Sequence, residues 1–236
     1  MPHSISRRTR SLAAAVVLAA VTLAATACNE SPTASDAGFT ASVSPASPTT
    51  TLGTTTTYTI TIQSQDYTGP VNVSVSGHPA SWVVTAATPS TVNVTAGGSA
   101  TVTITVQIPS NGEAAPSGRT LTFKVGGNGS ILSGTSKLTV KKEYVLAIPA
   151  GAGAAGPHWS VTSPLLLKSG TLLRIRNDDA TAHRIHTNGT IPGLAPQDAS
   201  MTQGQSYTAT VGVGTDVIYC ADHGDTTGQL TITVQP

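Results

Sequence analysis

The sequence Tyr219-Cys220-Ala221-Asp222-His223 lies near the C-terminus, between two segments that alternate apolar and polar residues as strands do. It contains Cys220, one of only two cysteines in the chain of 236 residues; the other is Cys28. Because Cys28 ends an export signal, Cys220 is a lone thiol in an exported protein, where cysteines are usually paired. Thiolate and imidazole are donors that copper and zinc prefer, so a cysteine three residues before a histidine indicates a metal site.

The N-terminal residues predict an exported and anchored protein. Three arginines among the first ten residues precede an apolar stretch, residues 12–25, that is too short for an ordinary membrane-spanning helix. Small residues and then Cys28 follow, and this ending resembles the bacterial lipobox, which implies removal of residues 1–27 as a signal peptide and lipid modification of Cys28. Residues 28–37 then form a polar tether. The prediction is a lipoprotein of the bacterial cell envelope, facing the periplasm or at the cell surface; cleavage near Ala27 to give a soluble secreted protein is the alternative.

The composition favours an all-β fold in two domains. Thr, Ser, Val and Gly are abundant, 39% of residues are hydrophobic and 10% are charged. The net charge is +1 and no basic cluster follows the N-terminus, so nucleic acid is not an expected partner.

The first predicted domain, residues 38–141, contains about seven short alternating segments between turns rich in Gly, Pro and Asn. This pattern predicts a two-sheet sandwich and resembles bacterial immunoglobulin-like or fibronectin-III-like modules. We expect a spacer that lifts the second domain off the membrane, with a glycan- or protein-binding module as the alternative.

The second predicted domain, residues 142–236, carries the chemistry. Alternation predicts its strands, with Leu173 facing inward and its neighbour Arg174 outward. His183 and His186 are an odd number of residues apart, so on a strand they face opposite sides and only one joins Cys220.

Several elements then occur in the order found in one family. An Asn-x-Asp turn at residues 177–179, His183, the Tyr-Cys-x-x-His sequence at residues 219–223 and a final Thr-x-Thr-Val strand resemble the cupredoxins, the plastocyanin-like blue-copper proteins. The resemblance covers roughly residues 168–234. It implies a Greek-key cupredoxin-like sandwich after the immunoglobulin-like one.

The resemblance also implies one mononuclear copper ion, held by His183, Cys220 and His223, since a blue-copper site combines two imidazoles, one thiolate and a weak axial donor. The departure from the family is the axial position, because no methionine follows the second histidine. Thr226 stands where methionine is common, and Gln229 is the candidate axial oxygen donor.

We therefore expect a copper protein that transfers single electrons to a redox protein partner and acts as a monomer. Copper binding or storage without electron transfer is one alternative, and a metal-free extracellular scaffold or adhesion protein is another; zinc is a competing metal. The sequence shows no Ser-His-Asp arrangement, P-loop or dinucleotide-binding turn. The His183-x-x-His186 spacing is also too wide for a multicopper oxidase motif, so we do not expect an enzyme.

Overall fold

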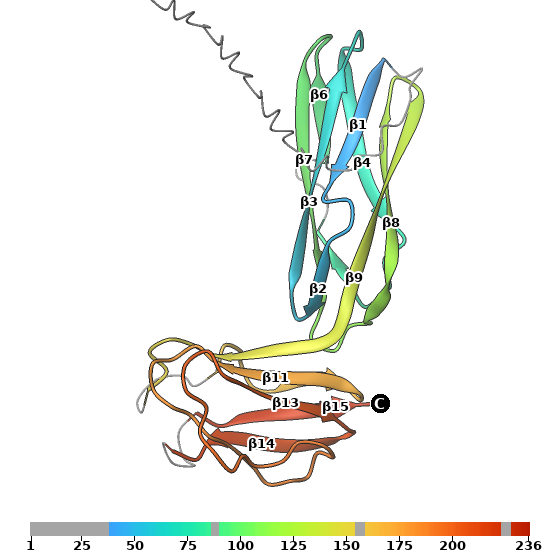
Figure 1. Cartoon of the computed structure of the whole chain (residues 1–236). Helices are drawn as coiled ribbons and strands as arrows, with labels where there is room; N and C mark the ends of the chain where they lie inside the picture. Colours follow the sequence, from blue (N-terminus) through green and yellow to red (C-terminus); the bar gives the residue numbers. More distant parts are fainter. Residues whose placement is uncertain (1–37, 86–89, 154–158, 223–227) are drawn as a thin grey trace, which may run out of the picture.

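The structure is a computed structural model that describes residues 38–85, 90–153, 159–222 and 228–236. Within these ranges the chain is built from strands and turns without helices, which confirms the all-β prediction. The strands form two β-sandwich domains, one after the other along the chain (Figure 1). In the same ranges, nothing meets the length and hydrophobicity that a bilayer-spanning helix requires.

The N-terminal sandwich is made of strands that alternate buried and exposed residues, as the period-two pattern predicts, and they pair antiparallel except for β2, which pairs parallel with β9. Its strands are β1 (Phe39–Ser44), β2 (Thr49–Leu52), β3 (Thr55–Ser64), β4 (Gly69–Ser76), β5 (Val83–Val84), β6 (Thr91–Val94), β7 (Ser99–Gln107), β8 (Ala115–Gly127) and the first part of β9 (Ser130–Ile148). One sheet has the order β1-β3-β7-β5, and β9-β8-β4-β6 forms the other. Between the sheets lie Tyr58 and Phe123, with ring centroids 5.0 Å apart, and Trp82, which is buried.

The C-terminal sandwich continues from β9. Its strands are β10 (Leu165–Lys168), β11 (Thr171–Asn177), β12 (Ile185–Thr187), β13 (Ser206–Val211), β14 (Gly214–Cys220) and β15 (Leu230–Gln235). One sheet has the order β10-β15-β14-β12, and β13, β11 and the end of β9 form the other. Leu173 and Ile175 of β11 are buried, whereas Arg174 and Arg176 face outward, as predicted.

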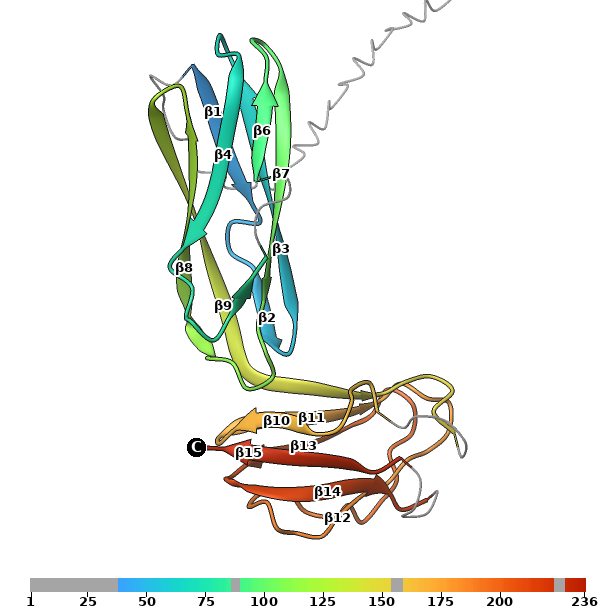
Figure 2. The same cartoon turned by 180° about the vertical axis from the view of Figure 1, so that it is seen from behind.

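Strand β9 belongs to both domains. It pairs antiparallel with β8 as far as Val140 and parallel with β11 from Glu143 onward. Figures 1 and 2 show this strand bending at the junction, so that the β10–β11 turn and the end of β15 lie beside the N-terminal domain. The domain boundary that we predict after residue 141 falls inside this strand, at the point where its partner changes.

Candidate metal centre

The strand pair β12–β14 brings two predicted ligands to one face of a sheet. Ile185 lies opposite Cys220 in the antiparallel register, and the Ala221 amide donates to the Arg184 carbonyl at 2.8 Å. His183 precedes Ile185 by two residues, so it lies on the same face as Cys220 and diagonal to it. Diagonal neighbours are about 7–8 Å apart between Cα atoms, a span that one bridging metal ion can cover when both side chains turn toward it. His183 is 0% exposed and Cys220 is 1% exposed.

The ring of His183 is oriented by a carboxylate. Its Nε2 lies 3.0 Å from Oδ2 of Asp179, and both residues are buried. The backbone of His183 is held as well, because it exchanges two hydrogen bonds with Met201, of 2.7 and 3.0 Å. Since Nε2 faces Asp179, a metal ion bound to this imidazole would be bound through Nδ1. Histidine ligands usually hold their other ring nitrogen in this way.

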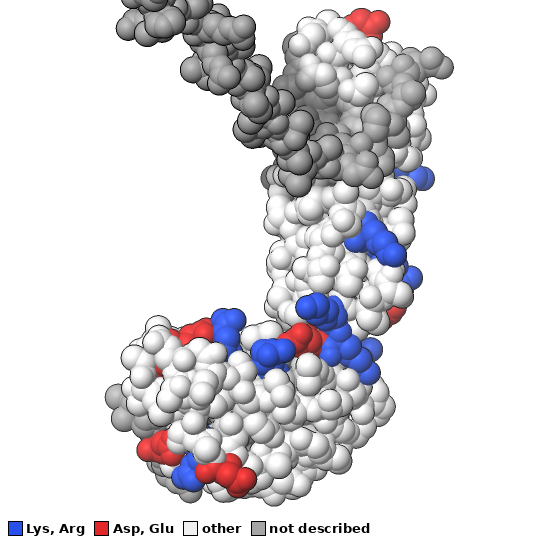
Figure 3. All heavy atoms as spheres, viewed as in Figure 1, with Lys and Arg blue, Asp and Glu red and all other residues white. Residues whose placement is uncertain are grey.

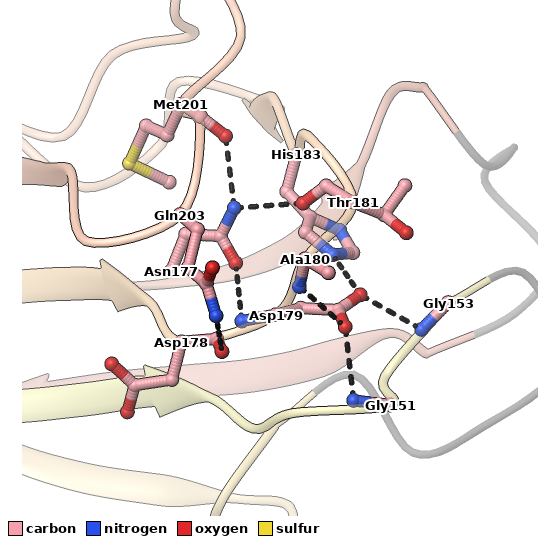
Figure 4. Close-up of polar contacts among 10 residues, drawn as sticks. All are labelled: Gly151, Gly153, Asn177, Asp178, Asp179, Ala180, Thr181, His183, Met201 and Gln203. Atoms are coloured by element: carbon pink, nitrogen blue, oxygen red, sulfur yellow. Dashed lines mark hydrogen bonds and ion pairs between the residues drawn. The ribbon is translucent and has the colours of Figure 1, made fainter.

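Asp179 also gathers backbone donors from two segments (Figure 4). Its Oδ1 accepts the amides of Gly151 and Ala180, both at 2.9 Å, and its Oδ2 accepts the amide of Gly153 at 3.1 Å. The hydrogen bond with His183 is the largest cause that lowers the pKa of Asp179 to about 2; burial opposes it, and the Gly151 and Ala180 amides add to it. The carboxylate is therefore ionised at neutral pH and suited to orient a neutral or a positively charged imidazole.

Asn177 builds the turn that carries Asp179. Its Nδ2 donates to the carbonyls of Thr181 at 2.8 Å and Met201 at 2.9 Å, and its Oδ1 accepts the Asp179 amide at 2.9 Å. Asp178 points away and forms a two-pronged pair with Arg176, at 2.6 and 2.8 Å. The two neighbouring carboxylates therefore diverge, and Asp179 is the one that stabilises the turn.

The remaining predicted site residues fall in two groups. His223, Thr226 and Cys28 lie outside the described residues. Gln229 is described and exposed, directly before β15, and the carbonyl of its neighbour Gly228 accepts a hydrogen bond from the Trp159 indole. Among the described residues no group of three or more His, Cys, Asp or Glu side chains is arranged for a metal ion. The third predicted ligand, His223, is outside that set, so the complete triad stays a prediction.

The opposite face of the strand pair carries different contacts. His186 is half-buried and stacks on Tyr219, with ring centroids 4.9 Å apart. Beyond the end of β14, Asp222 pairs with Arg184 at 3.3 Å and accepts the Ser200 hydroxyl at 2.7 Å. His183 and His186 therefore face opposite sides, as the spacing predicts, and the charge of Asp222 is balanced locally.

Comparison with known proteins gives a partial family match. Residues 50–126 match the NPCBM-associated, NEW3 domain of alpha-galactosidase, which is 77 of the 236 residues. This match lies entirely within the N-terminal sandwich. Among curated proteins, no sequence matches the chain significantly.

Solved structures resemble the chain only weakly. A variant of amicyanin in the Cu(I) state is 23% identical over 40% of this chain and 84% of that one, with a TM-score of 0.32. A multicopper oxidase from Campylobacter jejuni is 11% identical over 80% of this chain and 55% of that one, with a TM-score of 0.27. A family 123 glycoside hydrolase from Clostridium perfringens is 12% identical over 40% of this chain and 22% of that one, with a TM-score of 0.31. Scores this low carry no argument about function.

Proposed function

We propose that the C-terminal domain binds one copper ion through Nδ1 of His183, the thiolate of Cys220 and His223, and that the protein carries single electrons. The observation that supports this most is the Asp179–His183 pair on the same sheet face as the buried thiol of Cys220. A buried imidazole held by an ionised carboxylate is the arrangement that histidine ligands adopt in metal sites.

The donor set fits copper. Two imidazoles and one thiolate are the in-plane ligands of blue-copper centres, and copper bound there supplies a one-electron redox couple. The strands of the sheet hold His183 and Cys220 in place, and their burial limits contact with water. Gln229 is the proposed axial donor. Because its side chain is exposed, a weak or absent axial ligand is the alternative arrangement.

The rest of the chain would anchor the copper-binding domain and hold it away from the membrane. We propose that the protein is exported, anchored through a lipid on Cys28, and that the N-terminal sandwich acts as a spacer. The match to the NPCBM-associated, NEW3 domain of alpha-galactosidase favours a second candidate, in which residues 50–126 attach the protein to carbohydrate and the C-terminal domain is a metal-free scaffold. Neither candidate requires catalysis.

Copper titration of the purified full-length chain tests the proposal. We expect uptake of one copper per chain and an intense visible thiolate-to-copper band, which Cys220→Ser removes. His186→Asn is the matched control, because His186 faces the other side of the same strand, and it should keep the band. A pale and reversible complex would favour copper storage without electron transfer, and absence of stoichiometric uptake would leave the scaffold. Zinc competition in the same titration tests the choice of metal.

A further inference from the structure

A shallow groove of about 170 Å³ lies on the outer face of the N-terminal domain. It crosses strands β4, β8 and β9 near the β8–β9 hairpin, which Figures 1 and 2 show at the end of this domain far from the C-terminal domain. The volume is below the roughly 300–1,000 Å³ of pockets that enclose a drug-sized ligand, so a ligand would lie on the sheet with one small ring in the groove. The lining residues are Asn72, Val73, Ser74, Lys124, Gly126 and Ile131.

The floor of the groove is a glycine that the fold does not require. In the sheet register Gly126 stands between Asn72 of β4 and Ile131 of β9. Its φ is not positive, and a Cβ built on it would meet nothing closer than 3.9 Å. The adjacent Gly127 differs, because a Cβ there would stand 3.2 Å from the ring of Phe39 in the core. A glycine inside a strand weakens the strand and often marks a place where a ligand comes close to the backbone.

The walls of the groove combine one apolar side chain with polar ones. Ile131 is 69% exposed, more than any other large hydrophobic residue that the structure describes. Asn72 and Ser74, on the other side of the groove, are exposed and polar. A sugar ring has apolar C–H groups as well as hydroxyls, so an aliphatic side chain beside amide and hydroxyl groups suits one ring of a carbohydrate.

Lys124 makes the groove positive. It forms no ion pair with any other residue that the structure describes. Between Asp66 and Glu143 the sequence contains a single acidic residue, Glu113, which is paired with Arg119 at 2.6 Å. Figure 3 shows basic side chains over β8 and β9, with acidic side chains sparse on this domain. An ammonium group without a counter-charge favours a sugar that carries an acidic group.

The positive face continues along β9. Lys137 and Lys141 are exposed and lie on the same face as Ile131, because they are an even number of residues from it. Lys124 lies beside Ser133 in the register, so each lysine is four residues, or about 13 Å, beyond the previous one. This row suits a chain of acidic sugars better than a single small anion.

We propose that the outer face of β8 and β9 binds an anionic polysaccharide. One sugar ring lies over Gly126 against Ile131, its acidic group pairs with Lys124, and the chain runs along β9 toward Lys141. This inference rests on the second candidate function, attachment to carbohydrate, and names its surface and its class of ligand. It does not depend on copper binding by the C-terminal domain.

Isothermal titration calorimetry of the full-length chain with polygalacturonate, alginate and hyaluronate tests the class of ligand. We expect at least one of them to bind at low ionic strength. Its methyl-esterified form, which keeps the backbone and loses the charge, should bind about tenfold more weakly or less, since a hydrogen bond to a charged group is lost. Polyglutamate, an anionic chain without sugar rings, should not bind.

Gly126→Thr separates the groove from the fold. The threonine side chain would fill the groove, so polysaccharide binding should be lost, whereas the Tm should rise because a β-branched residue replaces glycine inside a strand. Lys124→Gln should weaken binding about tenfold. Lys142→Gln is the control: it removes the same charge from β9, but its Nζ lies at the β10–β11 turn, where a Cβ built on Gly170 would stand 2.7 Å from it.

The outcomes distinguish the surface from the function. Binding that both Gly126→Thr and Lys124→Gln retain would overturn this surface and leave attachment to carbohydrate in place. Esterified forms that bind as tightly as the acids, or equal binding of polyglutamate, would overturn the anionic polysaccharide as the ligand. Absence of binding by all three polysaccharides at millimolar sugar concentration would overturn the proposal, and absence of binding by neutral galactan as well would overturn the second candidate function itself.

Discussion

Two buried aspartates in the C-terminal domain accept the same number of backbone hydrogen bonds but differ in the side chain that donates to them. Asp179 and Asp216 are each 3% exposed, and each accepts three backbone amides. The fourth donor of Asp216 is the hydroxyl of Thr187 at 2.5 Å, whereas the fourth donor of Asp179 is the imidazole of His183. Both buried carboxylates thus fix turns, and only Asp179 is connected through an imidazole to the proposed metal site.

The largest effect is expected for Asp179→Ala. It leaves the amides of Gly151 and Gly153 and one nitrogen of His183 without their acceptor, so the Tm should fall by about 5–10 °C. The imidazole also loses its orienting partner, so copper affinity should fall about 10–100-fold. Thermal unfolding and competitive copper titration measure the two effects separately.

Asp178→Asn is the matched control for that variant. Asp178 is adjacent in sequence but pairs with Arg176 at the surface, where ion pairs contribute only about 0–1 kcal/mol. Tm and copper affinity should therefore stay close to those of the parent. A loss of copper affinity in this variant as large as in Asp179→Ala would contradict the assigned role of the Asp179–His183 pair.

Asp216→Ala should separate stability from metal binding. The substitution removes the acceptor of the Thr187 hydroxyl and of the Asn188 and Thr190 amides, so we expect a fall in Tm of about 5–10 °C. Copper affinity of the folded protein should be unchanged, because no contact joins Asp216 to His183 among the described residues. Equal loss of copper affinity in Asp179→Ala and Asp216→Ala would show that the contact of Asp179 with His183 has no specific role in copper binding.

Acid should destabilise the protein through both carboxylates. Burial alone would raise the pKa of Asp216, but the hydrogen bonds from Thr187, Thr190, Val217 and Asn188 outweigh it and lower the pKa. Because an unfolded aspartate has a pKa of about 3.9, the unfolded chain binds more protons, and this stability is present above that value and lost as the pH falls below it. For Asp179 the loss extends down to about pH 2. Urea unfolding of the metal-free chain between pH 2 and 6 should show the slope, and Asp216→Asn should reduce it.

The smallest effect is expected for His186→Ala, which tests the other face of the same strand. It removes the stacking contact with Tyr219, worth about 0.5–1.5 kcal/mol beyond buried area. Copper stoichiometry and the visible band should not change. Loss of the band in this variant would mean that the wrong histidine has been assigned.

The alternation of apolar and polar residues in the sequence was sufficient to predict which face of a strand each side chain lies on. It predicts that Leu173 and Ile175 are buried, and that His183 and His186 face opposite sides, because side chains alternate in any strand. It also contains the signal for Asp216, which we did not use: Asp216 is in phase with the buried residues Ile218 and Cys220.

Long-range pairing could not be predicted in the same way. The segment Lys141-Lys142-Glu143 indicates a domain boundary by its polarity, yet it lies inside the continuous strand β9. Lys141 and Lys142 are exposed where the strand passes from one core to the other, and Glu143 is largely covered and pairs with Arg174 of β11 at 2.6 Å. We did not predict strands β1 and β10. Strand β10 is short, and its parallel partner β15 is distant in sequence. The contact of Asp179 with His183 depends on the fold of the turn built by Asn177.

The central claim is that one copper ion is held by one sulfur and two imidazoles. X-ray absorption at the copper edge, on the full-length chain loaded with one equivalent, tests it most directly. We expect one short sulfur scatterer with two imidazole nitrogens, and loss of the sulfur in Cys220→Ser. A spectrum with only nitrogen and oxygen scatterers in the parent protein would contradict it.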